Sequence, residues 1–284
     1  MPFLFCLFLA YLLDRAQIKM CAGNYGSQFN GLGCVDNVNR RVALAPMAYR
    51  VLVPWLIWLA ERIVPSLRSR RLDVLYEPLK VLLLAVALWA TQAALGTMAM
   101  LALAAMLPAT FTFEYWDWEV ELAGLALALT GNLELSLIGG GLAALSRPET
   151  APLVALVYGL RTGDVSGTAA VGAVVTLLAL AVRLWVGRRR LYCSFWMWRR
   201  NIAELCALAK WHPWYLSNLA VTVAATAFTL AAVVYAIVGG WAGWTWLVPL
   251  AFLVAGWLAG VAAETRIFIP CLLWVVWAAS NVLA

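Results

Sequence analysis

The sequence contains little charge: Asp, Glu, Lys and Arg make up 12% of its 284 residues, and there is a single histidine. A water-soluble globule of this length needs more polar side chains to cover its surface, so that class of protein is excluded. The long apolar runs also lack the alternation of polar and apolar residues that strands of a membrane barrel require. With 65% hydrophobic residues, the chain is predicted to be all-α, a polytopic bundle of transmembrane helices.

Acidic residues are scarcer than basic ones, 14 against 20, which gives a net charge of +6. Most of the basic excess lies in two blocks, a pattern typical of cytoplasmic connections beside anionic lipid rather than of nucleic-acid binding. Membrane lipids are therefore expected partners, and nucleic acid is not. The blocks contain Arg62, Arg68, Arg70, Arg71 and Lys80, and then Arg183, Arg188, Arg189, Arg190, Arg199, Arg200 and Lys210.

The chain is expected to form one integral membrane domain over residues 1–284, with roughly eight to ten spans. Residues 14–65 are expected to form an outward loop with an interfacial helix. Residues 66–165 are expected to form central helices, and residues 166–284 a C-terminal set of helices. Placing both basic blocks in the cytoplasm leaves the first loop on the outer face.

Hydropathy and breaker residues predict the individual helices. The stretch 79–107 is long enough for one kinked span or two short ones, with Gly96 near its middle. The stretch 47–64, interrupted by Pro54, either lies along the membrane interface or crosses it. The expected helical stretches are 2–13, 47–64, 79–107, 118–130, 133–145, 151–160, 167–186, 216–238, 244–262 and 267–283.

Four carboxylates lie in an aromatic-rich stretch between apolar segments: Glu114, Asp117, Glu119 and Glu121. A carboxylate at membrane depth costs roughly 2.5 to 3.5 kcal/mol, so it persists where water, a cation or a partner is available. The cluster is therefore interpreted as a site, the alternative being an exposed acidic loop at the headgroup level. Asp117 and Glu114 are candidate ligands of a divalent cation such as Mg²⁺ or Mn²⁺, although no Asp-x-Asp string is present.

Two cysteines, Cys21 and Cys34, lie in a polar loop rich in Gly and Asn. A disulfide between them would restrain that loop if it faces an oxidising compartment. Neither cysteine has a histidine or a further cysteine at ligand spacing, so the case for zinc is weak.

Three strings, in this order and spacing, resemble the GT-C superfamily of multi-pass membrane glycosyltransferases and its uncharacterised bacterial relatives. The strings are Ala48-Tyr49-Arg50-Val51-Leu52-Val53-Pro54-Trp55-Leu56, then Tyr115-Trp116-Asp117 followed by Ala144-Leu145-Ser146-Arg147-Pro148-Glu149, then Glu264-Thr265-Arg266-Ile267-Phe268-Ile269-Pro270. The resemblance implies a lipid-phosphate-linked sugar donor, a catalytic carboxylate just after the first helix, often a divalent cation, and a multi-pass protein of the bacterial inner membrane.

Asp14 occupies the post-helix position that the resemblance implies for the catalytic carboxylate, and Asp36 is the reserve candidate. The alternative for Asp14 is an interfacial residue that pairs with Arg15 or caps the first helix. Arg50 and Arg147 are candidate contacts of the donor phosphate, because a guanidinium group matches phosphate oxygens and stays charged. Their alternative is an internal ion pair with Glu149, Asp117 or Glu114.

These features predict a membrane glycosyltransferase-like protein that moves a sugar from a polyprenyl-phosphate-linked donor to a lipid or glycan acceptor on the non-cytoplasmic face. One alternative is a non-catalytic membrane subunit that binds membrane protein partners, because sixteen tryptophans suit protein and lipid interfaces. The other is a transporter or flippase that uses buried carboxylates. The string Gly139-Gly140-Gly141 lacks the lysine of a phosphate loop and predicts close helix packing.

Overall fold

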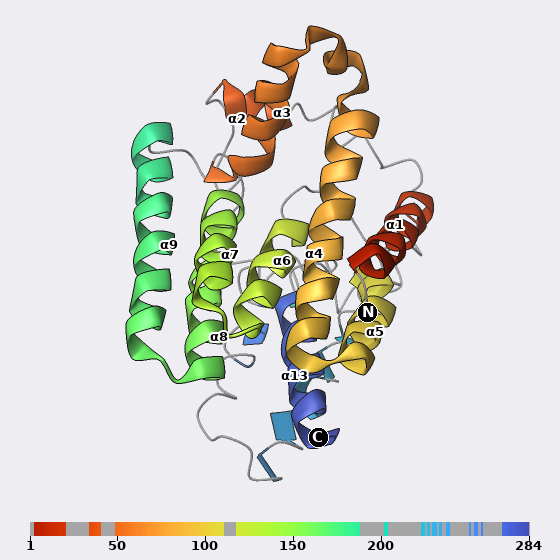
Figure 1. Ribbon diagram of the computed structural model, residues 1–284, viewed down its shortest axis with the longest axis vertical. Helices are drawn as coiled ribbons and strands as arrows, with labels where there is room; N and C mark the ends of the chain where they lie inside the picture. The colour runs from red at the N-terminus through yellow and green to blue at the C-terminus, as the bar shows by residue number, and fades with distance from the viewer. Residues whose placement is uncertain are drawn as a thin grey trace. The chain divides into compact units, whose positions relative to one another are not determined.

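The computed structural model describes residues 3–20, 34–40, 49–110, 118–187 and 269–283, together with scattered residues between positions 202 and 257. All regular secondary structure in these residues is helical, as the sequence predicts (Figure 1). The α-helices are α1 (Phe3–Met20), α2 (Cys34–Asn39), α3 (Leu52–Ile63), α4 (Glu77–Leu95), α5 (Thr97–Met106), α6 (Trp118–Leu129), α7 (Leu133–Ser146), α8 (Pro152–Thr162), α9 (Val165–Val186) and α13 (Ile269–Leu283). The 3-10 helices η3 (Pro65–Arg70) and η5 (Leu107–Thr110) and the π-helix η4 (Arg71–Tyr76) complete the set of described elements.

The chain divides into two compact units. The first comprises Met1–Met100 and Glu114–Tyr192, and the second comprises Leu101–Phe113 and Cys193–Ala284. In the second unit, α13 buries a continuous run from Cys271 to Ala278. The first unit contains all the candidate site residues that the structure describes. The expectation of a single domain stays a prediction.

Two helical stretches in the described residues are long and apolar enough to cross a membrane, Val74–Leu95 and Val165–Val186. Each has 22 residues, which corresponds to about 33 Å of helix, slightly more than the roughly 30 Å of a bilayer core. The short helices 118–130, 133–145 and 151–160 are confirmed as α6, α7 and α8. Residues 216–238 and 244–262 lie mostly outside the described part of the chain.

Local sequence signals explain where several helices begin and end. Gly96 has φ +90° and separates α4 from α5, so the stretch 79–107 forms two helices. Gly131 has φ +72°, and the Asn132 side chain accepts a hydrogen bond from the Leu135 N–H at the start of α7. Pro54 is the third residue of α3 and does not interrupt it, because the first turn of a helix requires no N–H donor.

The first helix differs from its prediction. The expected helix covers residues 2–13 and a polar loop follows, whereas α1 extends to Met20 and α2 lies inside the expected loop. The reason is that Asp14 and Gln17 are fully buried and contact Lys80 of α4. Polar side chains therefore continue the buried face of α1 beyond its apolar run.

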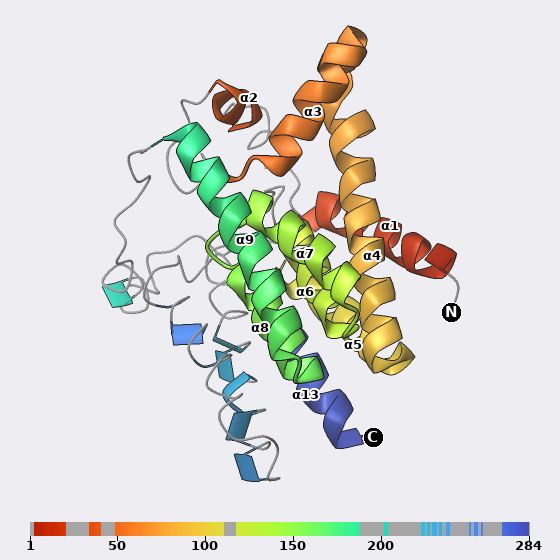
Figure 2. The same ribbon diagram turned by 60° about the vertical axis from the view of Figure 1, so that its left-hand side comes forward.

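Helices α1, α4, α6, α7 and α9 pack side by side in that order, which both views show (Figures 1 and 2). Helix α1 runs antiparallel to α4, because Asp14 meets Lys80 while Cys6 meets Gln92. Helix α7 crosses α6 closely: a Cβ added at Gly139 would lie 2.7 Å from the Gly124 carbonyl oxygen. This contact confirms that the glycine string serves helix packing.

The two ends of the first unit differ in charge, and we call the end at which Arg50, Arg147 and Arg183 lie the basic end. The prediction of which residues share one side of the membrane was wrong. At the basic end, the Val51 N–H donates to the Leu145 carbonyl at 2.8 Å, and the Tyr49 hydroxyl donates to the Gly187 carbonyl at 3.3 Å. The start of α3 therefore meets the ends of α7 and α9. At the opposite end, the Arg161 guanidinium donates to the Ala94 carbonyl at 3.1 Å.

The sequence predicted the basic blocks on one side of the membrane and the first loop, which includes Arg50, on the other. In the structure both groups of arginines lie at one end of the first unit. Arg183 lies there because the end of α9 meets the start of α3. Arg62 and Arg68 lie there because α3 follows Arg50 directly and is too short to cross a bilayer. Its 12 residues make a helix of about 18 Å. The chain turns back through η3 and η4 into α4 at the same end.

Candidate functional site

Two arginines and a glutamate that the sequence singled out come together at the basic end. Arg50 Nη2 lies 2.5 Å from Glu149 Oε1, and Arg147 Nε lies 3.7 Å from the same oxygen. Arg147 Nη1 also lies 2.7 Å from Oε2 of Glu121 in α6. We call Arg50, Arg147, Glu121 and Glu149 the arginine cluster. Its members come from four parts of the chain: the entry to α3, the end of α7, the first turn of α6, and the turn before α8.

Burial in the arginine cluster is graded. The side chains of Arg50 and Arg147 are 7% and 9% exposed and Glu121 is 1% exposed, whereas the Glu149 side chain is 36% exposed. Backbone contacts fix the arginines: the Arg147 N–H donates to the Ala143 carbonyl at the end of α7, and residue 51 is bonded to residue 145. Glu149 is therefore the accessible member, and both guanidinium groups lie behind it.

The alternative interpretation of Arg50, an ion pair with Glu149, is confirmed. Arg147 pairs most closely with Glu121, which sequence reasoning placed in the acidic cluster but not among the expected partners. Glu119 is 1% exposed and lies in the same first turn of α6. The two carboxylates of this turn are thus buried rather than part of an exposed loop.

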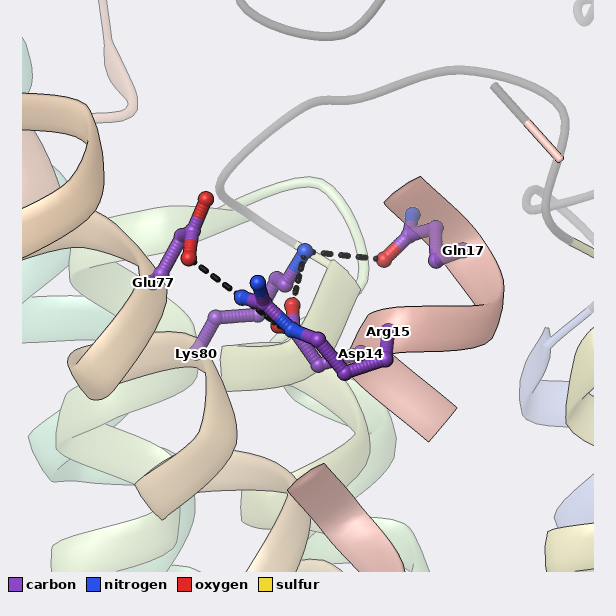
Figure 3. Close-up of polar contacts among 5 residues, drawn as sticks. All are labelled: Asp14, Arg15, Gln17, Glu77 and Lys80. Atoms are coloured by element: carbon purple, nitrogen blue, oxygen red, sulfur yellow. Dashed lines mark hydrogen bonds and ion pairs between the residues drawn. The ribbon is translucent and has the colours of Figure 1, made fainter. Parts of the chain in front are cut away.

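Asp14 belongs to a second polar group, shown in Figure 3. Lys80 Nζ lies 2.6 Å from Asp14 Oδ1, and Arg15 Nη2 lies 2.7 Å from Asp14 Oδ2. Lys80 also donates to Gln17 Oε1 at 3.0 Å, and Arg15 pairs with Glu77. Asp14, Lys80 and Gln17 are buried, with 0%, 1% and 0% exposure. We call these five residues the lysine cluster.

The predicted position of Asp14 was therefore wrong. It lies inside α1 and not in a loop after it, and both carboxylate oxygens are engaged by cations. The alternative pairing with Arg15 is confirmed. Lys80, assigned to a basic connection, is a buried ion-pair partner. Helical spacing was the signal in the sequence that could have indicated this buried pairing. Asp14 and Gln17 are three residues apart on α1, as Glu77 and Lys80 are on α4, so each pair lies on one face of its helix.

The remaining predicted residues are only partly described. Asp36 lies in the first turn of α2, which packs on α3 through a hydrogen bond from Asn39 Nδ2 to the Pro54 carbonyl at 3.0 Å. Glu114, Asp117 and Cys21 lie outside the described residues, as does the side chain of Cys34. Within the part of the chain that is described, no three His, Cys, Asp or Glu side chains are grouped as metal ligands.

At the opposite end, Asp164 caps α9. It accepts hydrogen bonds from the Gly167 N–H at 3.0 Å, the Ser166 hydroxyl at 2.7 Å and the Tyr158 hydroxyl at 2.9 Å. These bonds, above all the one from Gly167, lower the pKa of Asp164. The carboxylate is held in a purely local arrangement, which fits a helix cap.

No protein-family model matches the chain, and no curated protein or solved structure shows significant similarity to it. Its function must therefore be inferred from its own residues and contacts.

Proposed function

We propose that the chain is a multi-pass membrane glycosyltransferase-like protein that moves a sugar from a polyprenyl-phosphate-linked donor to a lipid or glycan acceptor. The observation that carries this proposal is the convergence of Arg50 and Arg147 on the carboxylate of Glu149. Two nearly buried guanidinium groups that share one partly exposed anion form a site for a phosphate group.

Glu149 occupies the position that the donor phosphate takes. Arg147 keeps Glu121 as a buried partner at 2.7 Å when Glu149 moves away, so one guanidinium stays anchored while its Nε and Arg50 turn to the phosphate. The released Glu149 carboxylate can then take the proton of an acceptor hydroxyl as the hydroxyl oxygen bonds to the anomeric carbon of the sugar and the polyprenyl phosphate leaves from the opposite face. Glu149 replaces Asp14 as the proposed base.

The test is sugar transfer by the purified chain in lipid nanodiscs, using a labelled polyprenyl-phosphate sugar. Arg50→Lys keeps the charge but loses the planar fork, so KM for the donor should rise about tenfold, which corresponds to about 1.4 kcal/mol of binding. Glu149→Gln should lower kcat more than it changes KM. Arg161→Gln, at the opposite end, is the matched control and should leave both parameters unchanged.

Two results would overturn the proposal. One is a wild-type chain that transfers no sugar from any polyprenyl-phosphate donor and binds none. The other is an Arg50→Lys variant whose KM equals that of the Arg161→Gln control. Thermal unfolding of each variant separates loss of the fold from loss of the site.

A second candidate function is a non-catalytic membrane subunit. The lysine cluster favours it, because the buried ion pair of Asp14 with Lys80 and the hydrogen bond from Lys80 to Gln17 hold α1 against α4, as structural groups do. Purification from the native membrane under mild detergent tests it: a stoichiometric protein partner together with absent donor binding would support this function over the first.

A further inference from the structure

The outer face of α3 exposes large aliphatic side chains at helical spacing. Leu56, Leu59 and Ile63 are 42%, 50% and 72% exposed, and positions three and four apart lie on one face of a helix. The opposite face is buried through Val53 and Ile57, which pack with Tyr76 and Val120. Helix α3 is thus fixed to the first unit by one face and leaves an aliphatic face uncovered.

Two arginines flank this face. Arg62 lies over the Trp58 ring, 4.9 Å from its centroid, and the Trp58 ring is itself 44% exposed. Arg68 is exposed in η3, one short turn further along the chain. Neither arginine has an ion-pair partner in the described part of the chain, so their positive charge is available to an external anion.

The location of α3 indicates what covers it. The helix lies at the N-terminal end of α4, one of the two candidate membrane spans, and near the C-terminal end of α9, the other (Figure 2). Trp55 of α3 contacts Trp185 of α9 with ring centroids 4.9 Å apart. A helix too short to span, apolar on one side, bordered by Trp and Arg and placed where two spans end, has the composition of an interfacial helix.

The geometry points to a binding face for anionic phospholipid on α3 and η3. Leu56, Leu59 and Ile63 enter the acyl boundary of one leaflet, and Arg62 and Arg68 contact the phosphate groups of its anionic lipids. Trp58 lies at the headgroup level between them. This inference goes beyond the proposed function, because it holds whether or not the chain transfers a sugar.

The decisive experiment is hydrogen exchange of the full-length chain in nanodiscs, read by mass spectrometry over residues 52–70. The wild-type chain is compared in phosphatidylcholine alone and in phosphatidylcholine with phosphatidylglycerol. Exchange should be slower in the anionic membrane, by about fivefold for each arginine that contacts a lipid phosphate. Arg62→Gln with Arg68→Gln should remove that difference and leave exchange in phosphatidylcholine unchanged.

Two controls keep the result interpretable. Arg161→Gln, at the opposite end, should retain the full lipid dependence over residues 52–70. Exchange of residues 165–186 should be the same in all variants, which shows that the first unit stays folded. Leu59→Gln, at a half-exposed position, should speed exchange over residues 52–70 in both membranes.

Equal exchange in the two membranes would overturn the proposal, and so would a lipid dependence that survives removal of both arginines. Slow exchange in both membranes that Leu59→Gln does not change would overturn it as well, and would indicate that another protein surface covers α3. A failed sugar-transfer assay does not affect any of these readouts.

Discussion

Gly124 of α6 and Gly139 of α7 face each other so closely that a Cβ on either residue would lie 2.7 Å from the carbonyl oxygen of the other. Helices approach to this distance only where both lack side chains, as small residues allow in membrane bundles. The close crossing brings the first turn of α6 beside the last turn of α7. It thereby sets the distance between Glu121 and Arg147 in the arginine cluster.

We expect Gly139→Ala to destabilise the fold by about 1 to 3 kcal/mol, because the new methyl group must push the α6 backbone away. Thermal unfolding in detergent measures the effect. Gly141→Ala is the matched control on the same helix, since its Cβ would meet only Leu178 Cδ1 at 3.5 Å. That control should be neutral or slightly stabilising, because alanine favours helix more than glycine does. Equal behaviour of the two variants would contradict the close contact.

The buried pair of Asp14 and Lys80 gives a second prediction. Lys80→Met should destabilise the fold by about 3 kcal/mol, because it leaves a fully buried carboxylate with only the half-exposed Arg15 to balance it. The double change Asp14→Leu with Lys80→Met should recover most of that loss, since the replacement groups are apolar. Chemical or thermal unfolding of the wild type, Lys80→Met, Asp14→Leu and the double variant gives the coupling free energy.

Arg15→Gln serves as the control for this pair. The Arg15 side chain is 40% exposed, so its loss should cost clearly less than the loss of Lys80. If the double variant were as unstable as Lys80→Met alone, the ion pair would not be the source of the instability.

The helices of the first unit could largely be predicted from sequence, while the pairing of charges could not. The break between α6 and α7 follows from Gly131 and Asn132, whose backbone preference and capping side chain act within a few residues. The burial of Asp14 depends on Lys80, 66 positions further along the chain, and hydropathy assigned those two residues to a loop and to a basic connection. Contacts between residues far apart in the sequence decide which charged side chain is buried, and a local sequence pattern does not predict those contacts.

The candidate site shows the same limit. Sequence strings identified Arg50, Arg147 and Glu149, and the structure brings these three together. Their side of the membrane was predicted from the basic blocks alone, which left out the short length of α3 and its return into α4. Because α3 is short and the chain returns into α4, the site and the basic residues lie at the same end of the first unit and not at opposite ends.

Asp164 gives a prediction about pH. Its folded-state pKa is lowered, so its contribution to stability is present above its unfolded pKa of about 3.9 and is lost as the pH falls through the lower folded value. Asp164→Asn keeps a capping oxygen but cannot titrate. The melting temperature of the wild type should exceed that of the variant by a constant amount from pH 7 to pH 5, and the difference should shrink as the pH falls below the unfolded pKa of about 3.9.

Glu134→Gln, a second carboxylate-to-amide change in the first turn of α7 and at the same end of the first unit as Asp164, is the control for general effects of such a substitution. A wild-type advantage over Asp164→Asn that persists unchanged at pH 3 would exclude the carboxylate charge as its source.

The orientation of the two ends gives the last prediction. Arg62 and Arg68 precede α4 and Arg183 lies in the last turn of α9, whereas the opposite end carries Arg161 together with the carboxylates of Glu134 and Asp164. From the excess of arginine we expect the basic end to face the cytoplasm. Ser66→Cys in η3 and Ser166→Cys at the start of α9 are matched exposed positions at the two ends.

In intact cells, a membrane-impermeant thiol reagent should label Ser166→Cys above the level of the wild-type chain and should label Ser66→Cys only after permeabilisation. Labelling of Ser66→Cys from outside would contradict the orientation. Because Ser66 and the arginine cluster lie at the same end of α4, that result would also move the cluster to the non-cytoplasmic leaflet. The leaflet from which a lipid-linked donor reaches Arg50 and Arg147 thus follows from two single-cysteine variants, independently of any transferase assay.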